Sequence, residues 1–125
     1  VSGYRSYERQ EELYRKKLRE QPKGSETPVQ WVAPPGASEH QTGLALDVSC
    51  QAVDYKLDER FGETREGLWL KRYAPLFGFI LRYSKGKEHI TGYGWEPWHI
   101  RYVTRSLALY LTLTGLTLEE YYEQK

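Results

Sequence analysis

Residues 38–47 read SEHQTGLALD and place His40 and Asp47 on either side of a turn at Gly43. Over residues 44–49, apolar side chains alternate with small or polar ones, and a period of two is typical of a strand. We therefore predict a half-buried strand with the carboxylate of Asp47 on its open face. A carboxylate in that position needs partners from elsewhere in the chain.

Residues 95–99, which read WEPWH, can supply such a partner. The alternation returns over residues 98–103, and it leaves His99 on the less apolar face. If this segment and the strand of Asp47 share a sheet, then His40, Asp47 and His99 converge in one cleft. Two imidazoles and a carboxylate are ligands that a catalytic zinc site uses, with the fourth position left to water.

Glu96 stands three residues before His99, and Pro97 between them disfavours a regular helix. We therefore place Glu96 on a loop that leads into the strand. From there its carboxylate is within reach of the attacking water, whose proton it can accept.

These two segments resemble those of a known enzyme family. SEHQTGLALD resembles the SxHxxGxAxD motif of the VanY-type D-Ala-D-Ala carboxypeptidases, and EPWH resembles their second motif, ExxH with Trp before the His. The likeness runs from GYRS at Gly3 to the closing LTLEEY. The wider superfamily joins lysostaphin-type peptidases, D-Ala-D-Ala metallopeptidases and the hedgehog signalling domain. Two motifs in the right order are far more specific than either motif alone.

The resemblance implies roles for individual residues. It implies a catalytic base at Glu96, with Zn²⁺ as the cofactor. The zinc ligands that it implies are His40, Asp47 and His99. The substrate contacts that it implies are Arg5, Gln10, Ser38 and Tyr83. From the aromatic residues themselves we expect Trp98, together with Tyr93 and Trp95, to wall the pocket that holds the substrate.

The substrate residues also have purely structural interpretations. The planar guanidinium of Arg5 suits a terminal carboxylate or a developing oxyanion, and a surface salt bridge is the alternative. Gln10 is equally interpretable as an ordinary amide on a helix surface. Ser38 is equally interpretable as a residue that caps or turns the backbone.

Other patterns predict the elements around the motifs. The fold class that we predict is α+β, with a small antiparallel sheet that carries the metal cleft and helices that flank it. Residues 104–114 are ambiguous between strand and helix, and Gly115 as a stop favours helix. The remaining predicted elements are a short strand over 1–4, a helix from Ser6 to about 21, a loop over 22–39 that contains Trp31, a helix over 64–77 with Trp69 and Tyr73 in the core, a strand over 79–83, a turn over 84–87, His89 in a loop near the cleft mouth, and a final helix opened by Thr117.

Composition restricts the class of protein. A chain of 125 residues is large enough for one core, and we expect residues 1–125 to be a single catalytic domain and a monomer. Its 18 Lys and Arg nearly balance 17 Asp and Glu, so the overall charge does not predict nucleic-acid binding. No apolar run in the sequence approaches the length needed to span a membrane. The lone Cys50 excludes an internal disulfide and is expected in the core. The abrupt start suggests a domain trimmed at its N-terminus, and a natural short form is the alternative.

We therefore expect a zinc-dependent D,D-carboxypeptidase that removes the terminal D-alanine from peptidoglycan stem peptides or their precursors, at the cell envelope or extracellular side of a bacterium. An L,D-carboxypeptidase or a cell-wall endopeptidase of the same fold is the first alternative, because relatives with this metal site differ in the bond that they cut. A non-catalytic, hedgehog-like binding module is the second, although it would not require Glu96. Other divalent ions suit these ligands, and a tetrahedral site favours zinc.

Overall fold

Three strands form the centre of the computed structural model, which describes residues 1–22 and 32–124. The strands β1 (Ala45–Asp47), β2 (Phe79–Tyr83) and β3 (Glu96–Tyr102) form an antiparallel sheet in the order β1-β3-β2. The strand predicted over residues 1–4 is reduced to one bridge, in which Ser2 pairs with Asp47. Trp31 and the rest of residues 23–31, which are half of the predicted loop, lie outside the described residues.

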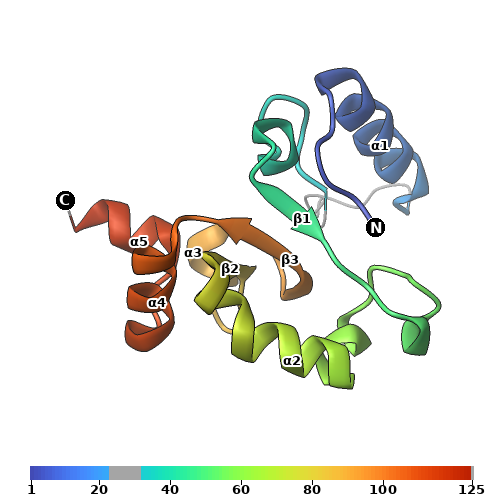
Figure 1. The fold of residues 1–125 in the computed structure, drawn as a ribbon. Helices are drawn as coiled ribbons and strands as arrows, with labels where there is room; N and C mark the ends of the chain where they lie inside the picture. Colours follow the sequence, from blue (N-terminus) through green and yellow to red (C-terminus); the bar gives the residue numbers. More distant parts are fainter. Residues whose placement is uncertain (23–31, 125) are drawn as a thin grey trace.

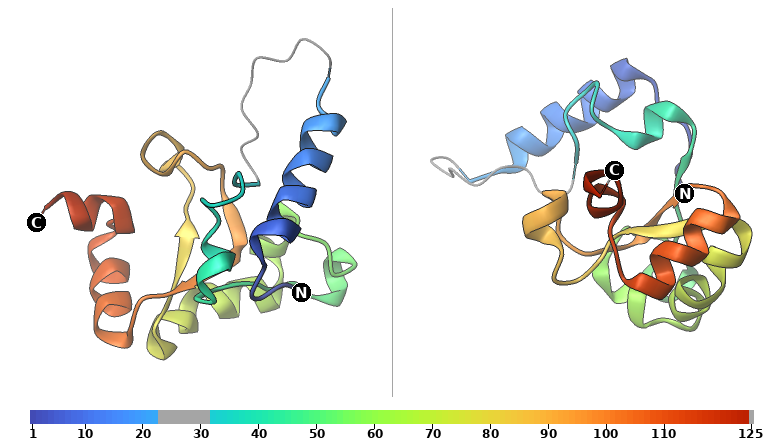
Figure 2. Two further views of the ribbon diagram at one scale, coloured as in Figure 1. Left: turned by 90° about the horizontal axis from the view of Figure 1, so that it is seen from above. Right: turned by 90° about the vertical axis from the view of Figure 1, so that its left-hand side faces the viewer.

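The helices surround this sheet and confirm the predicted α+β class. In Figure 1, α1 lies at one end of the molecule, α4 and α5 lie at the other, and α2 runs alongside the sheet; Figure 2 shows the same arrangement from two further directions. Four short 3₁₀ turns, η1 to η4, link these elements. The α-helices are α1 (Tyr7–Glu20), α2 (Arg65–Tyr73), α3 (Glu88–Thr91), α4 (Arg105–Thr114) and α5 (Leu118–Glu123), and the 3₁₀ turns are η1 (Glu39–Thr42), η2 (Gln51–Val53), η3 (Glu59–Glu63) and η4 (Ala74–Phe77).

Side-chain caps explain why the helices begin where the sequence predicted. The hydroxyl of Ser6 accepts a hydrogen bond from the backbone of α1, and that of Thr64 does the same for α2. Thr117 and Glu120 form a complete capping box at the start of α5. Gly115 ends α4 in the left-handed conformation with φ of 74°, so the ambiguous segment is a helix.

The packing predicted for α2 was wrong. The α-helix ends at Tyr73 and continues as the tighter turn η4, because Pro75 has no backbone N–H to donate. Trp69 is 56% exposed rather than part of the core. The buried residues of this helix are Gly67 and Leu70, and a helix that rests on one face turns the residue next to Leu70 towards solvent.

The orientation predicted for β1 was also wrong. Asp47 is 3% exposed, whereas Leu46 is 41% exposed, so the carboxylate faces inward and the apolar side chain faces outward. Asp47 has buried polar partners on the inner side of the strand, and their hydrogen bonds compensate for its burial. Leu46 is left to cover Gly3 at the surface.

Two apolar clusters hold the elements together. The larger cluster packs Phe61 of η3 and Leu70 of α2 against Trp98 and Ile100 of β3, and it includes Cys50 as predicted. The smaller one packs Ile80 of β2 against Ala108, Leu111 and Leu118 of α4 and α5. Among the described residues, no helix is both long and apolar enough to cross a membrane.

Candidate functional site

The register of the sheet brings Asp47 and His99 together. In the β1–β3 pair, Asp47 lies directly opposite His99, and directly opposed residues share one face of the sheet. Oδ1 of Asp47 lies 3.1 Å from Nδ1 of His99. The carboxylate that ends the short strand β1 is therefore held against an imidazole at the middle of β3.

His40 reaches the same point from the turn before β1. The hydroxyl of Ser38 caps η1 by accepting a hydrogen bond from the backbone N–H of His40, and Gly43 ends the turn with φ of 76°. Nδ1 of His40 lies 2.7 Å from the carbonyl oxygen of Gly3, which fixes the ring. Its other nitrogen, Nε2, lies 3.1 Å from Oδ2 of Asp47.

Glu96 is the first residue of β3 and does not lie on the predicted loop. The β2–β3 register pairs Leu81 with Ile100 but Tyr83 with Glu96, so β3 uses two more residues than β2 in this stretch. Such a bulge accommodates a proline in a strand and interrupts the alternation of side chains. Oε2 of Glu96 thereby lies 3.8 Å from Nδ1 of His99.

The donor set fits a transition metal. His40, Asp47 and His99 are all buried, and one ligand atom from each lies within 4.8 Å of the others. Two imidazole nitrogens and one carboxylate oxygen match a catalytic zinc site better than a magnesium or calcium site, which prefers oxygen ligands. The structure thus brings together the three residues that the sequence predicted.

Burial governs the electrostatics of these groups. Burial raises the pKa of Glu96 to about 8, and like charge on Asp47 and Glu39 adds to the effect. Burial would raise the pKa of Asp47 as well, but hydrogen bonds with His40 and His99 outweigh it and hold that pKa below its usual range. Burial opposes the positive charge of His99, yet hydrogen bonds with Asp47 and Glu39 raise its pKa to about 9.

Arg5 lies against the carboxylate of Asp47. Its guanidinium donates to Asp47 Oδ2 at 2.8 Å, to Gln10 Oε1 at 2.9 Å and to Ser2 Oγ at 3.1 Å. Gln10 is 1% exposed and donates in turn to the carbonyl oxygen of Ala33 at 2.6 Å. Gln10 is therefore a buried link between α1, Arg5 and the segment before η1, not an amide on the helix surface.

Aromatic rings form one wall of the site. The ring of Tyr83 packs at 4.7 Å from that of Tyr93 and at 5.0 Å from that of His99, measured between centroids. Trp98 lines the cleft while it belongs to the larger apolar cluster. His89 is exposed on α3, not in a loop, and is not among the described residues that line the cleft.

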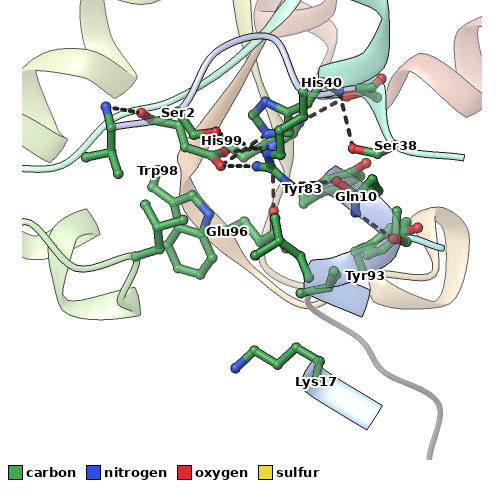
Figure 3. A pocket seen from close by; sticks show the side chains of 18 of the residues that line it. Ser2, Gln10, Lys17, Ser38, His40, Tyr83, Tyr93, Glu96, Trp98 and His99 are labelled. Atoms are coloured by element: carbon green, nitrogen blue, oxygen red, sulfur yellow. Dashed lines mark hydrogen bonds and ion pairs between the residues drawn. The ribbon is translucent and has the colours of Figure 1, made fainter. Parts of the chain in front are cut away.

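The cleft extends well beyond the metal ligands. It has a volume of about 1040 Å³, and Figure 3 shows His40, His99 and Glu96 converging at one part of it while Lys17 lies far from them. Gln10 is the only residue of α1 that was predicted to lie in the cleft, although helical spacing places several other residues on the same face of the helix. The residues of α1 that line it besides Gln10 are Arg9, Leu13, Lys16, Lys17 and Glu20.

A charged cluster next to His99 was not predicted from the sequence. Glu39 contacts His99, Arg82 and Arg101. The available signals were the position of Glu39 next to His40 and that of Arg101 two residues after His99 in a strand, where alternate residues share a face.

The chain is similar to a known protein family and to several named proteins. Residues 1–105 match the family model described as VanY, D-alanyl-D-alanine carboxypeptidase. The chain is 48% identical over 124 residues to the putative carboxypeptidase YodJ of Bacillus subtilis (strain 168), which covers 99% of this chain and 45% of the relative. The chain thus spans about half the length of the curated relatives it matches.

Solved structures give the same picture. The LdcB LD-carboxypeptidase is 48% identical, with a TM-score of 0.87 over 98% of this chain and 56% of that chain. The vancomycin resistance D,D-pentapeptidase VanY, in complex with Zn(II), is 38% identical, with a TM-score of 0.80 over 98% of this chain and 69% of that chain. The similarity in fold therefore extends over nearly the whole chain.

Proposed function

Because the chain belongs to the VanY family of D-alanyl-D-alanine carboxypeptidases, we propose that it is a zinc-dependent D,D-carboxypeptidase that removes the terminal D-alanine from peptidoglycan stem peptides or their precursors. One observation carries this proposal. His40, Asp47 and His99 converge with Glu96 in a cleft that a peptide can enter. In this proposal, residues 1–125 form one catalytic domain.

His40, Asp47 and His99 hold the zinc. When bound, zinc polarises the scissile carbonyl and makes its water more acidic. Glu96 accepts the proton of the attacking water and delivers it to the leaving amine. Burial raises the pKa of its carboxyl group, which makes Glu96 a stronger base than an exposed glutamate.

Arg5 and its neighbours hold the end of the peptide. Contacts with Ser2, Gln10 and Asp47 engage three of the five N–H groups of Arg5 among the described residues, so the guanidinium can still donate to a terminal carboxylate. Gln10 orients Arg5 by accepting a hydrogen bond from its guanidinium. Ser38, Tyr83 and Trp98 line the cleft and contact the substrate backbone and side chains.

A second candidate activity is supported by a specific observation. The LdcB LD-carboxypeptidase is 48% identical to this chain, whereas the D,D-pentapeptidase VanY is 38% identical. An L,D-carboxypeptidase would remove D-alanine from a tetrapeptide, in which L-lysine or another L-centre precedes it. Either substrate belongs to the wall of a bacterium, so we place the protein at the cell envelope. We also propose that it acts as a monomer, because one chain supplies all three ligand residues.

Mass spectrometry of products separates these activities. The zinc-loaded protein is incubated with a synthetic stem pentapeptide that ends in D-Ala-D-Ala and, separately, with the tetrapeptide that lacks the last residue. We expect the pentapeptide to lose one alanine and the tetrapeptide to persist. A tripeptide product from the tetrapeptide would select the L,D-activity, and internal cleavage would select the endopeptidase. No cleavage of either peptide, with zinc bound, would contradict the proposal.

A further inference from the structure

The carboxylate of Glu39 lies directly behind His99. Its Oε1 is 3.1 Å from Nε2 of His99, on the side of the ring opposite Asp47. Its Oε2 accepts hydrogen bonds from Nε of Arg82 at 2.9 Å and from Nη1 of Arg101 at 2.5 Å. The Glu39 side chain is 12% exposed, so these contacts are largely shielded from water.

Arg82 connects this cluster to the C-terminal helix. Its Nη1 donates to both carboxylate oxygens of Glu119 on α5. The capping box at Thr117 sets the first turn of α5, which holds Glu119. The two arginines and two glutamates balance in charge.

The cluster dictates where the proton on His99 lies. Oε2 of Glu39 accepts hydrogen bonds from two guanidinium groups, those of Arg82 and Arg101, and this pairing holds the carboxylate in its ionised form. An ionised carboxylate only accepts hydrogen bonds. Neutral His99 therefore carries its proton on Nε2 and turns the lone pair of Nδ1 towards Asp47. His40 is held in the opposite sense, because the carbonyl of Gly3 accepts from its Nδ1.

We propose that Glu39 is a positioning residue of the metal centre, which fixes the tautomer and the ring orientation of His99, and that Glu119 holds Glu39 in place through Arg82. This inference rests on the proposed function, since it concerns the zinc ligands assigned there. Carboxylates that accept from a ligand histidine typically contribute 10- to 100-fold to metal affinity, and this is the magnitude that we expect for Glu39.

The substitution Glu39→Gln tests the first half of the proposal. Arg82 and Arg101 both donate, so the amide oxygen should face them and the amide N–H₂ should face His99. That arrangement favours a proton on Nδ1 of His99, where the metal must bind. We expect competition with a chromophoric chelator to show zinc binding weakened by about 10- to 100-fold. Affinity within about threefold of the parent, in a folded variant, would overturn the role of Glu39.

Nitrogen NMR of the zinc-loaded parent tests the same claim without any substitution. With ¹⁵N-labelled histidine, His99 should show a protonated Nε2 and a metal-bound Nδ1, and His40 should show the reverse. Binding of zinc through Nε2 of His99 would overturn the inference. This measurement decides the matter even if Glu39→Gln does not fold.

The substitution Glu119→Gln tests the contribution of α5, and Glu123→Gln on the same helix is its matched control, because Glu123 is exposed. We expect Glu119→Gln to weaken zinc binding several-fold, less than Glu39→Gln does, and Glu123→Gln to leave it unchanged. Equal affinities for the two variants would overturn the role of Glu119. A parent that takes up no zinc would overturn the proposed function as well, whereas a parent that binds zinc but hydrolyses no stem peptide would overturn the proposed function alone.

Discussion

At the scale of the residue, the carboxylate of Asp47 joins three other side chains of the site. Its Oδ2 contacts Arg5 and His40, and its Oδ1 contacts His99. Apart from Thr117, the buried polar residues of the described chain are six of the predicted site residues: Gln10, Ser38, His40, Asp47, Glu96 and His99. Burying a polar side chain is unfavourable unless it is hydrogen-bonded, so this concentration marks the site independently of any motif.

Glu96→Gln should separate catalysis from metal binding. The amide preserves the shape of the side chain but cannot accept the proton of water, so we expect kcat to fall by about 10²-fold or more. Zinc content, measured by elemental analysis, should stay at the parent level. A variant with near-parent kcat would place the base elsewhere, and a variant that loses zinc would make Glu96 a ligand.

Arg5 should make the enzyme sensitive to the charge at the end of the peptide. A charge-assisted hydrogen bond contributes about 1.5 to 3 kcal/mol, so a C-terminally amidated substrate should lose roughly tenfold to a hundredfold in kcat/KM. In Arg5→Ala, the acid and the amide should be cleaved at similar, low rates. Arg15→Ala, an exposed arginine on α1 that does not line the cleft, serves as the control and should keep the difference. If the parent cleaves both forms equally, the endopeptidase alternative replaces the exopeptidase.

At the scale of the element, the site depends on irregularities more than on regular structure. The turn η1 positions His40, and the bulge in the β2–β3 register positions Glu96. α2 packs against the sheet through Leu70 of the larger cluster. The neighbouring Trp69 is exposed, and its ring centroid lies 5.3 Å from that of Tyr73.

Two neighbouring substitutions on α2 test this packing. Leu70→Ala removes buried methyl groups and should lower the free energy of unfolding by about 2 to 5 kcal/mol. Trp69→Ala removes the larger side chain, yet it should cost less than about 1 kcal/mol because most of that side chain is already in water. Urea unfolding of both variants measures the difference. A larger loss for Trp69→Ala would mean that α2 packs through its other face.

At the scale of the whole molecule, the metal centre is tied to both ends of the fold. Gln10 and Arg5 connect α1 to Asp47, and Glu39 with Arg82 connects α5 to His99. A metal that orders the three ligands should therefore also stabilise α1 and α5, which lie far apart in Figure 1. A ligand that binds only the folded state stabilises all of it.

Zinc should accordingly raise the stability of the whole protein. At a free zinc concentration of 100 times Kd, the free energy of unfolding should increase by about 2.7 kcal/mol. For a chain of this size we expect Tm to rise on the order of 10 °C. Thermal melts with and without zinc measure the change, and magnesium, which prefers oxygen ligands, is the control. His40→Ala should abolish the response; a parent whose Tm does not move would contradict a specific site.

Local patterns in the sequence were sufficient for much of this description. The caps at Ser6, Thr64 and Thr117 act through hydrogen bonds within one helical turn, so they predict where helices begin. The two motifs identified the family and the residues that converge, because a metal site needs particular side chains at particular spacings. These are short-range or chemical requirements, which the residue types themselves express.

Only the tertiary structure decided which way each face points and what supports the site. Alternation predicted the two faces of β1 but assigned the buried side to the wrong one, because the hydrogen-bonding partners of Asp47, not the hydrophobicity of Leu46, decided it. Trp69 is exposed because no element of the described chain covers its side of α2, a fact that no local pattern contains. Glu39, Arg82 and Glu119 meet across large sequence separations, and such ion pairs have no periodic signature in a sequence. Their cooperation depends on how helix and sheet pack, which is a property of the folded chain.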